Sequence, residues 1–121
     1  MIGRLESLVI DCPDPRALAR FYSKLLGLEI VGYDDDWAEI VAADGSRPII
    51  AFQKVESYNP PQWPSQTVPQ QMHLDVRVDD FEVAEAAVLE IGATKTGSET
   101  PTFRVYRDPA GHPFCLIMPS D

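Results

Sequence analysis

Residues 72–80 read MHLDVRVDD, and the fold prediction begins from this stretch. Polar and apolar side chains alternate as far as Val78, which is typical of a β-strand with one face against a core. Asp79 and Asp80 follow and offer a cap for the first turn of a helix. The stretch therefore predicts a strand over residues 72–78 that leads directly into a helix.

The helix after this strand is expected to pack through one apolar stripe. Its members recur at helical spacing: Val83, Ala87, Val88 and Ile91. Gly92 predicts the end of the helix. Three further strands are expected over residues 94–96, 102–107 and 113–118, with a turn at residues 108–111 before the last one. The second half of the chain is thus predicted to be βαβββ.

The first half of the chain repeats this order. Three pairs of residues are each 66 positions apart: Ser7 and His73, Asp14 and Asp80, and Gly45 and Gly111. A strand is expected over residues 5–11, followed by a helix that is capped by Asp14, begins at Pro15 and ends at Gly27. The apolar stripe of this helix is Leu18, Phe21, Tyr22, Leu25 and Leu26. Strands over residues 28–33, 37–42 and 48–55 complete the unit.

The prediction is therefore an α+β fold made of two tandem βαβββ modules, residues 1–56 and 71–121, which form a curved mixed sheet or cup. Residues 57–70 hold four prolines and are expected to be an extended linker. A length of 121 residues with 45% hydrophobic content fits a single domain.

Charge and cysteine content narrow the classes of function. Ten basic residues against 19 acidic ones give a net charge of -9, which disfavours binding to nucleic acid or to anionic membranes. The apolar stretches are too short to cross a bilayer, and the first residues do not resemble a secretion signal, so we expect a cytoplasmic protein. Cys12 and Cys115 are expected to be reduced thiols.

Three segments carry a resemblance to a known family: residues 14–28, residues 72–80, and residues 108–114 with the sequence DPAGHPF. They resemble the vicinal oxygen chelate superfamily, which includes glyoxalase I, bleomycin-resistance proteins, fosfomycin-resistance enzymes and extradiol dioxygenases. The resemblance covers nearly the whole chain and is nearest to the uncharacterised glyoxalase-like domain proteins. It implies that paired modules curl into a cup that binds a small molecule.

The resemblance also implies where a divalent metal is held in the metal-dependent members, namely on the first and last strands of each module. His73 occupies a position at which the family commonly has a metal-binding histidine. Ser7 occupies the matching position in the first module, Cys115 stands where the family often has a glutamate, and Ile50 or Ala51 fills the fourth place. Because a catalytic ion usually needs about three protein donors, a divalent metal is possible but disfavoured.

The residues themselves suggest a binding surface. Strand alternation places His73, Asp75 and Arg77 on one face, where they line a pocket or form a solvated polar network. In the first case His73 is the candidate catalytic residue, acting in proton transfer. Arg104 and Tyr106 share a face of another strand and could hold an anionic or phenolic group. The predicted substrate-binding set is Ser7, Asp75, Arg77, Arg104, Tyr106 and Cys115.

Three other side chains are expected to serve structure. We expect Cys115 to pack chiefly as a small apolar residue and Trp63 to cover the edge of the core. His112 lies inside a turn and is expected at the surface.

Three functions stay open. The first is a glyoxalase-like or dioxygenase-type enzyme, a lyase or an isomerase, in which His73, with or without a metal, polarises an oxygenated substrate. The second is a metal-independent protein that sequesters a small molecule, as bleomycin-resistance proteins do. The third is a non-catalytic homodimeric module that buries its exposed sheet edges.

Overall fold

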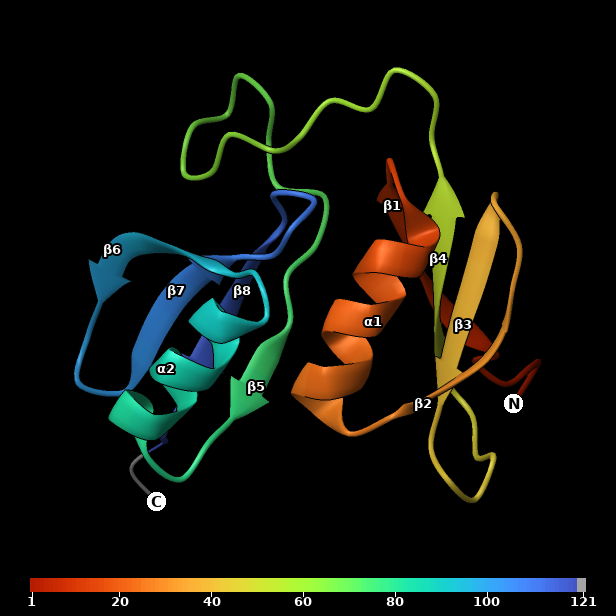
Figure 1. Cartoon of the computed structure of the whole chain (residues 1–121), viewed down its shortest axis with the longest axis horizontal. Coiled ribbons are helices and arrows are strands. Elements are labelled where there is room, and N and C mark those ends of the chain that lie inside the picture. Colours follow the sequence, from red (N-terminus) through yellow and green to blue (C-terminus); the bar gives the residue numbers. More distant parts are fainter. Residues whose placement is uncertain (120–121) are drawn as a thin grey trace. The chain divides into compact units, whose positions relative to one another are not determined.

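The computed structural model describes residues 1–119, apart from the side chain of Tyr33. The chain forms two compact units that divide after Tyr58. Each unit contains one helix and one four-stranded sheet, and Figure 1 labels these elements in chain order. Among the described residues, neither helix has the length and apolar character needed to span a membrane.

The first unit has the order βαβββ. Its elements are β1 (Ser7–Cys12), α1 (Pro15–Leu26), β2 (Glu29–Tyr33), β3 (Trp37–Val41) and β4 (Ile49–Lys54). The strand order in the sheet is β1-β4-β3-β2. β1 pairs with β4 in parallel, and the other two pairings are antiparallel.

The second unit repeats this topology. Its elements are β5 (Asp75–Arg77), α2 (Phe81–Glu90), β6 (Thr94–Glu99), β7 (Phe103–Arg107) and β8 (Pro113–Ile117). The strand order is β5-β8-β7-β6, again with one parallel pairing between the first and last strands. The predicted α+β fold of tandem βαβββ modules is confirmed.

Helix α1 forms as its sequence predicts. The Asp14 carboxylate accepts a hydrogen bond from the Ala17 N–H at 3.2 Å, Pro15 stands at the first helical position, and Gly27 ends the helix at a φ of 69°. The apolar stripe packs on the sheet, where the Tyr22 ring stacks on Phe52 at 5.8 Å between centroids. This packing provides the core of the first unit.

Helix α2 packs through a different face from the one that the apolar pattern predicts. Val83 is 69% exposed, whereas Val88 is buried. The side of the helix turned to the sheet carries Phe81, Ala84, Glu85 and Val88, at positions i, i+3, i+4 and i+7. The predicted stripe was wrong because a glutamate lies in the middle of the packed face, where β7 supplies partners for its charge.

Strand β5 is shorter than the predicted strand over residues 72–78, so His73 lies just before the strand rather than on it. The parallel ladder with β8 includes a hydrogen bond from the Cys115 N–H to the Leu74 carbonyl at 2.8 Å. A pairing of position 113 with His73 would need an N–H at position 113, which proline lacks. Pro113 therefore cannot extend the ladder as far as His73.

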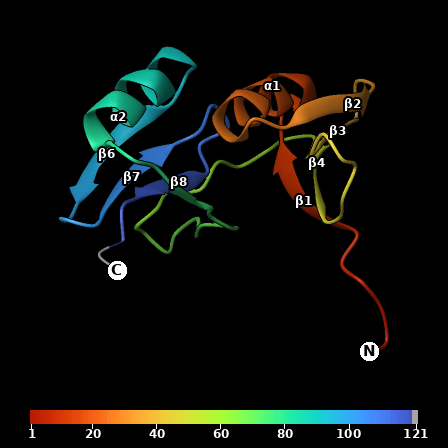
Figure 2. The same cartoon turned by 90° about the horizontal axis from the view of Figure 1, so that it is seen from below.

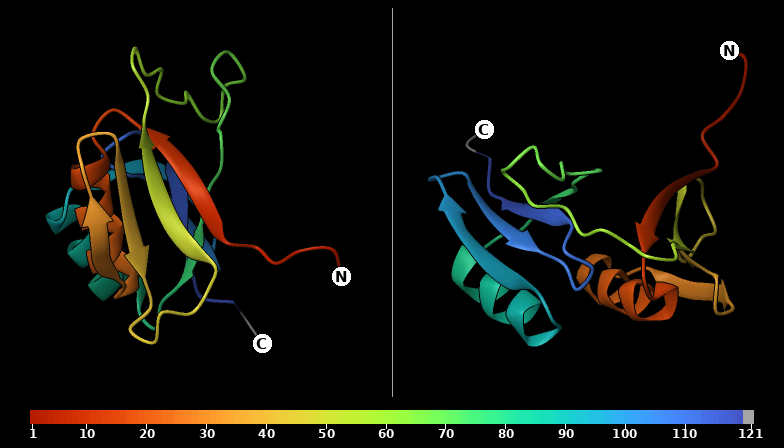
Figure 3. Two further views of the ribbon diagram at one scale, coloured as in Figure 1. Left: turned by 90° about the vertical axis from the view of Figure 1, so that its right-hand side faces the viewer. Right: turned by 90° about the horizontal axis from the view of Figure 1, so that it is seen from above.

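Residues of the predicted linker belong to the second unit and pack on it. Figures 2 and 3 show residues 60–70 (green) on the face of the sheet opposite α2. Gly111 in the turn before β8 has a φ of 91°, and a Cβ there would lie 3.1 Å from the Pro60 Cβ. The neighbouring Pro61 is buried. The turn and the proline-rich segment are thus in close contact.

His112 in the same turn is fully buried, so the expectation of a surface side chain was wrong. The buried Asp108 carboxylate accepts hydrogen bonds from the N–H groups of Ala110 and His112, at 2.8 and 3.0 Å. These hydrogen bonds pair backbone N–H groups of the turn with a buried carboxylate. The turn can therefore lie in the core instead of projecting into water.

The repeat provides a matched test of this contact. Gly111→Ala is expected to lower the free energy of unfolding by about 1 kcal/mol more than Gly45→Ala. Both glycines have a positive φ, but a Cβ at Gly45 meets nothing within 4 Å. Urea titration of the two variants gives the comparison, and equal losses would show that Pro60 does not restrict position 111.

Candidate functional site

A pocket of about 280 Å³ lies within the second unit. It is lined by Trp63, Gln70, His73, Asp75, Phe103, Val105, Pro113, Cys115 and Ile117. Two aromatic and three aliphatic side chains make most of this lining, and the remaining four are polar or ionisable. A small apolar pocket with a few convergent polar groups is the usual form of a small-molecule site.

The register of the strands explains which residues line the pocket. Asp75 lies opposite Cys115 in the parallel pairing of β5 with β8, and Cys115 lies opposite Val105 in the antiparallel pairing of β8 with β7. Residues in register point to the same face of a sheet. These three side chains therefore form one row across the sheet, and Phe103 and Ile117 belong to the next row.

The His73 imidazole is held by Gln70. The His73 Nδ1 lies 3.1 Å from the Gln70 Oε1, and because that oxygen has only lone pairs, Nδ1 is the donor. The Nε2 of the neutral ring is then an acceptor. It lies 3.6 Å from the Asp75 Oδ1, which is beyond hydrogen-bonding distance. In the neutral tautomer with its proton on Nδ1, Nε2 and the Asp75 carboxylate are two neighbouring acceptors at the pocket.

The Cys115 thiol contacts the same carboxylate. Burial, together with the negative charge of Asp75 and a hydrogen bond to it, raises the pKa of the Cys115 thiol to about 11. Near neutral pH the sulfur is therefore protonated and is a weak nucleophile. The sequence predicts chiefly packing for Cys115 and also includes it in the substrate-binding set; its side chain is part of the pocket wall, and the binding role stays a prediction.

The same three side chains could hold a metal ion. One ligand atom from each of His73, Asp75 and Cys115 lies within 4.8 Å of the others. A nitrogen, an oxygen and a sulfur donor suit zinc, and three donors leave one position open. Binding would require the Cys115 thiol to lose its proton, which Asp75 opposes. The donors fit an ion in number and type, and the state of the thiol decides whether all three are available.

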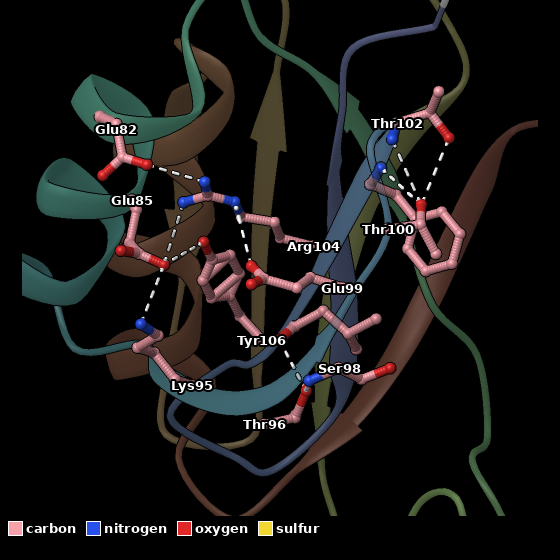
Figure 4. Close-up of polar contacts among 12 residues, drawn as sticks. Glu82, Glu85, Lys95, Thr96, Ser98, Glu99, Thr100, Thr102, Arg104 and Tyr106 are labelled. Atoms are coloured by element: carbon pink, nitrogen blue, oxygen red, sulfur yellow. Dashed lines mark hydrogen bonds and ion pairs between the residues drawn. The ribbon is translucent and has the colours of Figure 1, made fainter.

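Arg104 and Tyr106 share a face of β7 as predicted, but it is the face turned to α2 (Figure 4). The Arg104 guanidinium lies 2.7 Å from a Glu82 oxygen, 3.5 Å from Glu85 and 3.3 Å from Glu99. The Tyr106 hydroxyl donates to Glu85 at 2.7 Å. Neither residue lines the pocket. The substrate-binding role predicted for these two residues stays a prediction that this pocket does not include.

These contacts shift the pKa values of the groups involved. Burial and the bond to Glu85 raise the pKa of Tyr106 to about 12. The hydrogen bond from Tyr106, aided by the charges of Lys95 and Arg104, lowers the pKa of Glu85. The hydrogen bond to Glu82 is the main cause that raises the pKa of Arg104. These ion pairs and hydrogen bonds hold α2 against β7.

The remaining predicted residues lie outside the lining of this pocket. Arg77 is exposed on β5. It lies two residues after Asp75 and therefore on the same face of the strand. Ser7 is the first residue of β1 in the first unit, on the sheet face opposite the buried Ile10 and Cys12. The substrate-binding roles assigned to these two residues stay predictions.

Six lining residues are absent from the predicted set, namely Trp63, Gln70, Phe103, Val105, Pro113 and Ile117. Trp63 and Gln70 are the two that do not belong to a strand. Both come from the proline-rich segment, where no periodic pattern indicates which side chains point inward. The Trp63 carbonyl accepts a hydrogen bond from an Arg107 nitrogen of β7 at 3.0 Å, which ties this segment to the sheet. The proline content predicted an extended segment, but its docking depends on tertiary contacts.

Comparison with known families identifies the class of protein. The family model for the glyoxalase-like domain matches residues 7–117. The chain belongs to this family. Comparison with curated proteins finds none that matches.

Solved structures agree on the fold. A glyoxalase/bleomycin resistance protein/dioxygenase family enzyme from Burkholderia phytofirmans PsJN is 19% identical, with a TM-score of 0.69 over 94% of this chain and 97% of that one. Fosfomycin resistance protein FosX from Mesorhizobium loti is 15% identical, with a TM-score of 0.70 over 99% and 94%. A protein from Agrobacterium tumefaciens is 18% identical, with a TM-score of 0.72 over 99% and 100%. The chain therefore has the fold of the vicinal oxygen chelate superfamily.

The Cys115 thiol provides a test of the site's electrostatics. In a Cys12→Ala background, the rate of alkylation by iodoacetamide is expected to rise with a midpoint near pH 11. Asp75→Asn is expected to lower this midpoint, because it removes a negative charge beside the thiolate, while burial keeps part of the shift. Asp79→Asn removes an equal charge outside the pocket and serves as control. An unchanged midpoint in Asp75→Asn would mean that the carboxylate does not contact the thiol.

The network around Glu85 predicts an effect of acid. Because the pKa of Glu85 in the folded chain is below its ordinary value of 4.5, its carboxylate stabilises the fold above that pH, and this contribution is lost as the pH falls further. Glu85→Gln is expected to make stability fall less steeply in acid, as measured by urea unfolding at several pH values. Glu90→Gln, at an exposed position of the same helix, is the control. A slope as steep as that of the unmodified protein contradicts the role given to Glu85.

Proposed function

We propose that the protein binds a small organic molecule in the pocket of the second unit without a metal ion. The observation that carries the proposal is the arrangement of the lining, in which Trp63, Phe103 and the aliphatic side chains surround a single polar cluster of His73, Asp75 and Cys115. The apolar part of a ligand would bury its surface against the aromatic and aliphatic side chains, and the polar cluster would orient a polar substituent of the same ligand.

His73 contributes the main directional contact in this proposal. Gln70 fixes the ring so that Nε2 offers its lone pair to the pocket. A ligand that donates a hydrogen bond there replaces the water that the exposed nitrogen otherwise binds. The same nitrogen is placed to accept a proton if the ligand is chemically changed, which would make the protein an enzyme of lyase or isomerase type.

A metal ion would have to displace the Cys115 proton, and burial and Asp75 raise the pKa of this thiol. Ion binding therefore carries a cost that ligand binding without a metal does not. The predicted cytoplasmic location and homodimeric state are consistent with this proposal and stay predictions.

A metal-dependent enzyme is the second candidate, favoured by the close grouping of the three donor atoms. In that case His73, Asp75 and the deprotonated Cys115 would hold the ion, and the ion would supply Lewis-acid polarisation of a substrate oxygen. Asp75 would change its role from partner of the thiol to ligand.

Elemental analysis and a fragment screen separate these functions. Protein purified without added metal is expected to contain much less than one equivalent of any transition metal, and His73→Ala is expected to give the same result. Fragments that shift the backbone amide signals of Asp75, Val105 and Cys115 are expected to bind the unmodified protein at least ~10-fold more tightly than His73→Ala. Gln66→Ala, at an exposed linker position outside the lining, is the control.

Two results would count against the proposal. One equivalent of metal in the unmodified protein that is lost in His73→Ala would establish the second candidate instead. A broad fragment panel that leaves the pocket signals unchanged would remove the binding function altogether.

A further inference from the structure

We infer that the ligand of this pocket is a small organic cation, a protonated amine attached to an aromatic or aliphatic body. The inference rests on the proposed binding function and adds the chemical class of the ligand. It follows from the hydrogen-bonding groups that remain available once the contacts within the protein are counted.

The polar cluster presents acceptors to the pocket. The His73 Nδ1 proton is used by Gln70, and the Cys115 thiol is bonded to Asp75. The His73 Nε2 lone pair and the Asp75 carboxylate remain, 3.6 Å apart. An ammonium group carries up to three N–H donors and a positive charge, so one such group satisfies both acceptors at once.

The lining holds no positive charge that would attract an anion. None of the lining residues of this pocket is a lysine or an arginine. Arg104 is held among three glutamates on the opposite face of β7, and Arg107 donates to the Trp63 carbonyl. Arg77, in register with Ile117, and Arg107, in register with Pro113, border the pocket but are not among its lining residues. Asp75 is thus the one charged side chain of the lining apart from a protonated His73, and the chain has a net charge of -9, so an anion is disfavoured there relative to a cation.

The aromatic part of the lining favours the same class of ligand. Trp63 and Phe103 both line the pocket. The negative faces of aromatic rings attract ammonium groups, and the rings also bury the apolar body that carries the charge. A sugar or another strongly hydrated neutral molecule would leave much of this apolar wall without a partner.

The test uses three probes that share one aromatic body: 2-phenylethylamine, 2-phenylethanol and phenylacetate. Binding to the full chain is followed by the amide signals of Asp75, Val105 and Cys115, in the presence of a chelator so that no metal bridges the probe. The amine is expected to bind at least ~10-fold more tightly than the alcohol, and phenylacetate more weakly than either.

Variants locate the source of the preference. Asp75→Asn keeps the shape of the side chain and removes its charge, so the preference for the amine over the alcohol is expected to disappear. Amide signals outside the pocket that match those of the unmodified protein show that this variant is folded. Asp79→Asn makes the same change in net charge outside the pocket and is expected to keep the preference.

The outcomes distinguish the two levels of the proposal. If the alcohol or phenylacetate binds as tightly as the amine, the ligand class is wrong and the binding function stands. If the preference survives in Asp75→Asn, the charge that selects the amine is not in this pocket, and the inference fails. If none of the three probes shifts the amide signals of the pocket but other fragments do, only the proposed ligand class is wrong. If no fragment of the whole panel shifts these signals, the binding function is wrong as well.

Discussion

Parallel pairing between the first and last strands of each unit, β1 with β4 and β5 with β8, is the constraint on which the rest of the structure depends. Two parallel neighbours cannot be joined by a tight turn, so the chain must pass over the sheet in a helix before the remaining strands are added. The helix covers one face of the sheet. In the second unit the pairing also brings Asp75 opposite Cys115, although 39 residues stand between them in the sequence.

The two faces of β7 consequently have different roles. Arg104 and Tyr106 point to α2 and bind its glutamates, which gives a packed helix face that contains the charge of Glu85. Phe103 and Val105 point to the other side and line the pocket. Arg104 is bound on the helix side, whereas Arg107, on the same face as Phe103 and Val105, donates to the Trp63 carbonyl. The structure thus separates the charges that stabilise the unit from those that are available to a ligand.

Much of the fold could be predicted from the sequence because the signals are local and repeated. Asp14 and Asp80 cap their helices, and the 66-residue spacing correctly predicted two βαβββ units. The stripe of α2 was wrong in part: Val88 is on the packed face, but hydrophobicity alone does not reveal a half-buried glutamate whose partners come from β6 and β7. The surface position expected for His112 was wrong because the turn around it is bonded from inside by Asp108.

The candidate site could be predicted only in part. Alternation along one strand placed His73 and Asp75 together, but the face of β7 depends on its register with β8, which the sequence does not specify. Trp63 and Gln70 lie in a segment without periodicity, and they reach the pocket through contacts with Arg107 and His73. These contacts are tertiary, so no local sequence pattern predicts them.

The protonation of the His73 ring is the most direct test of the account, because the acceptor at Nε2 defines both the pocket and the ligand it takes. It is measured by nitrogen-15 NMR of the imidazole over a range of pH, at values where the spectrum itself shows a neutral ring, with His73→Ala used to assign the signals. The account predicts a proton on Nδ1 and a free lone pair on Nε2. A proton on Nε2 would contradict it.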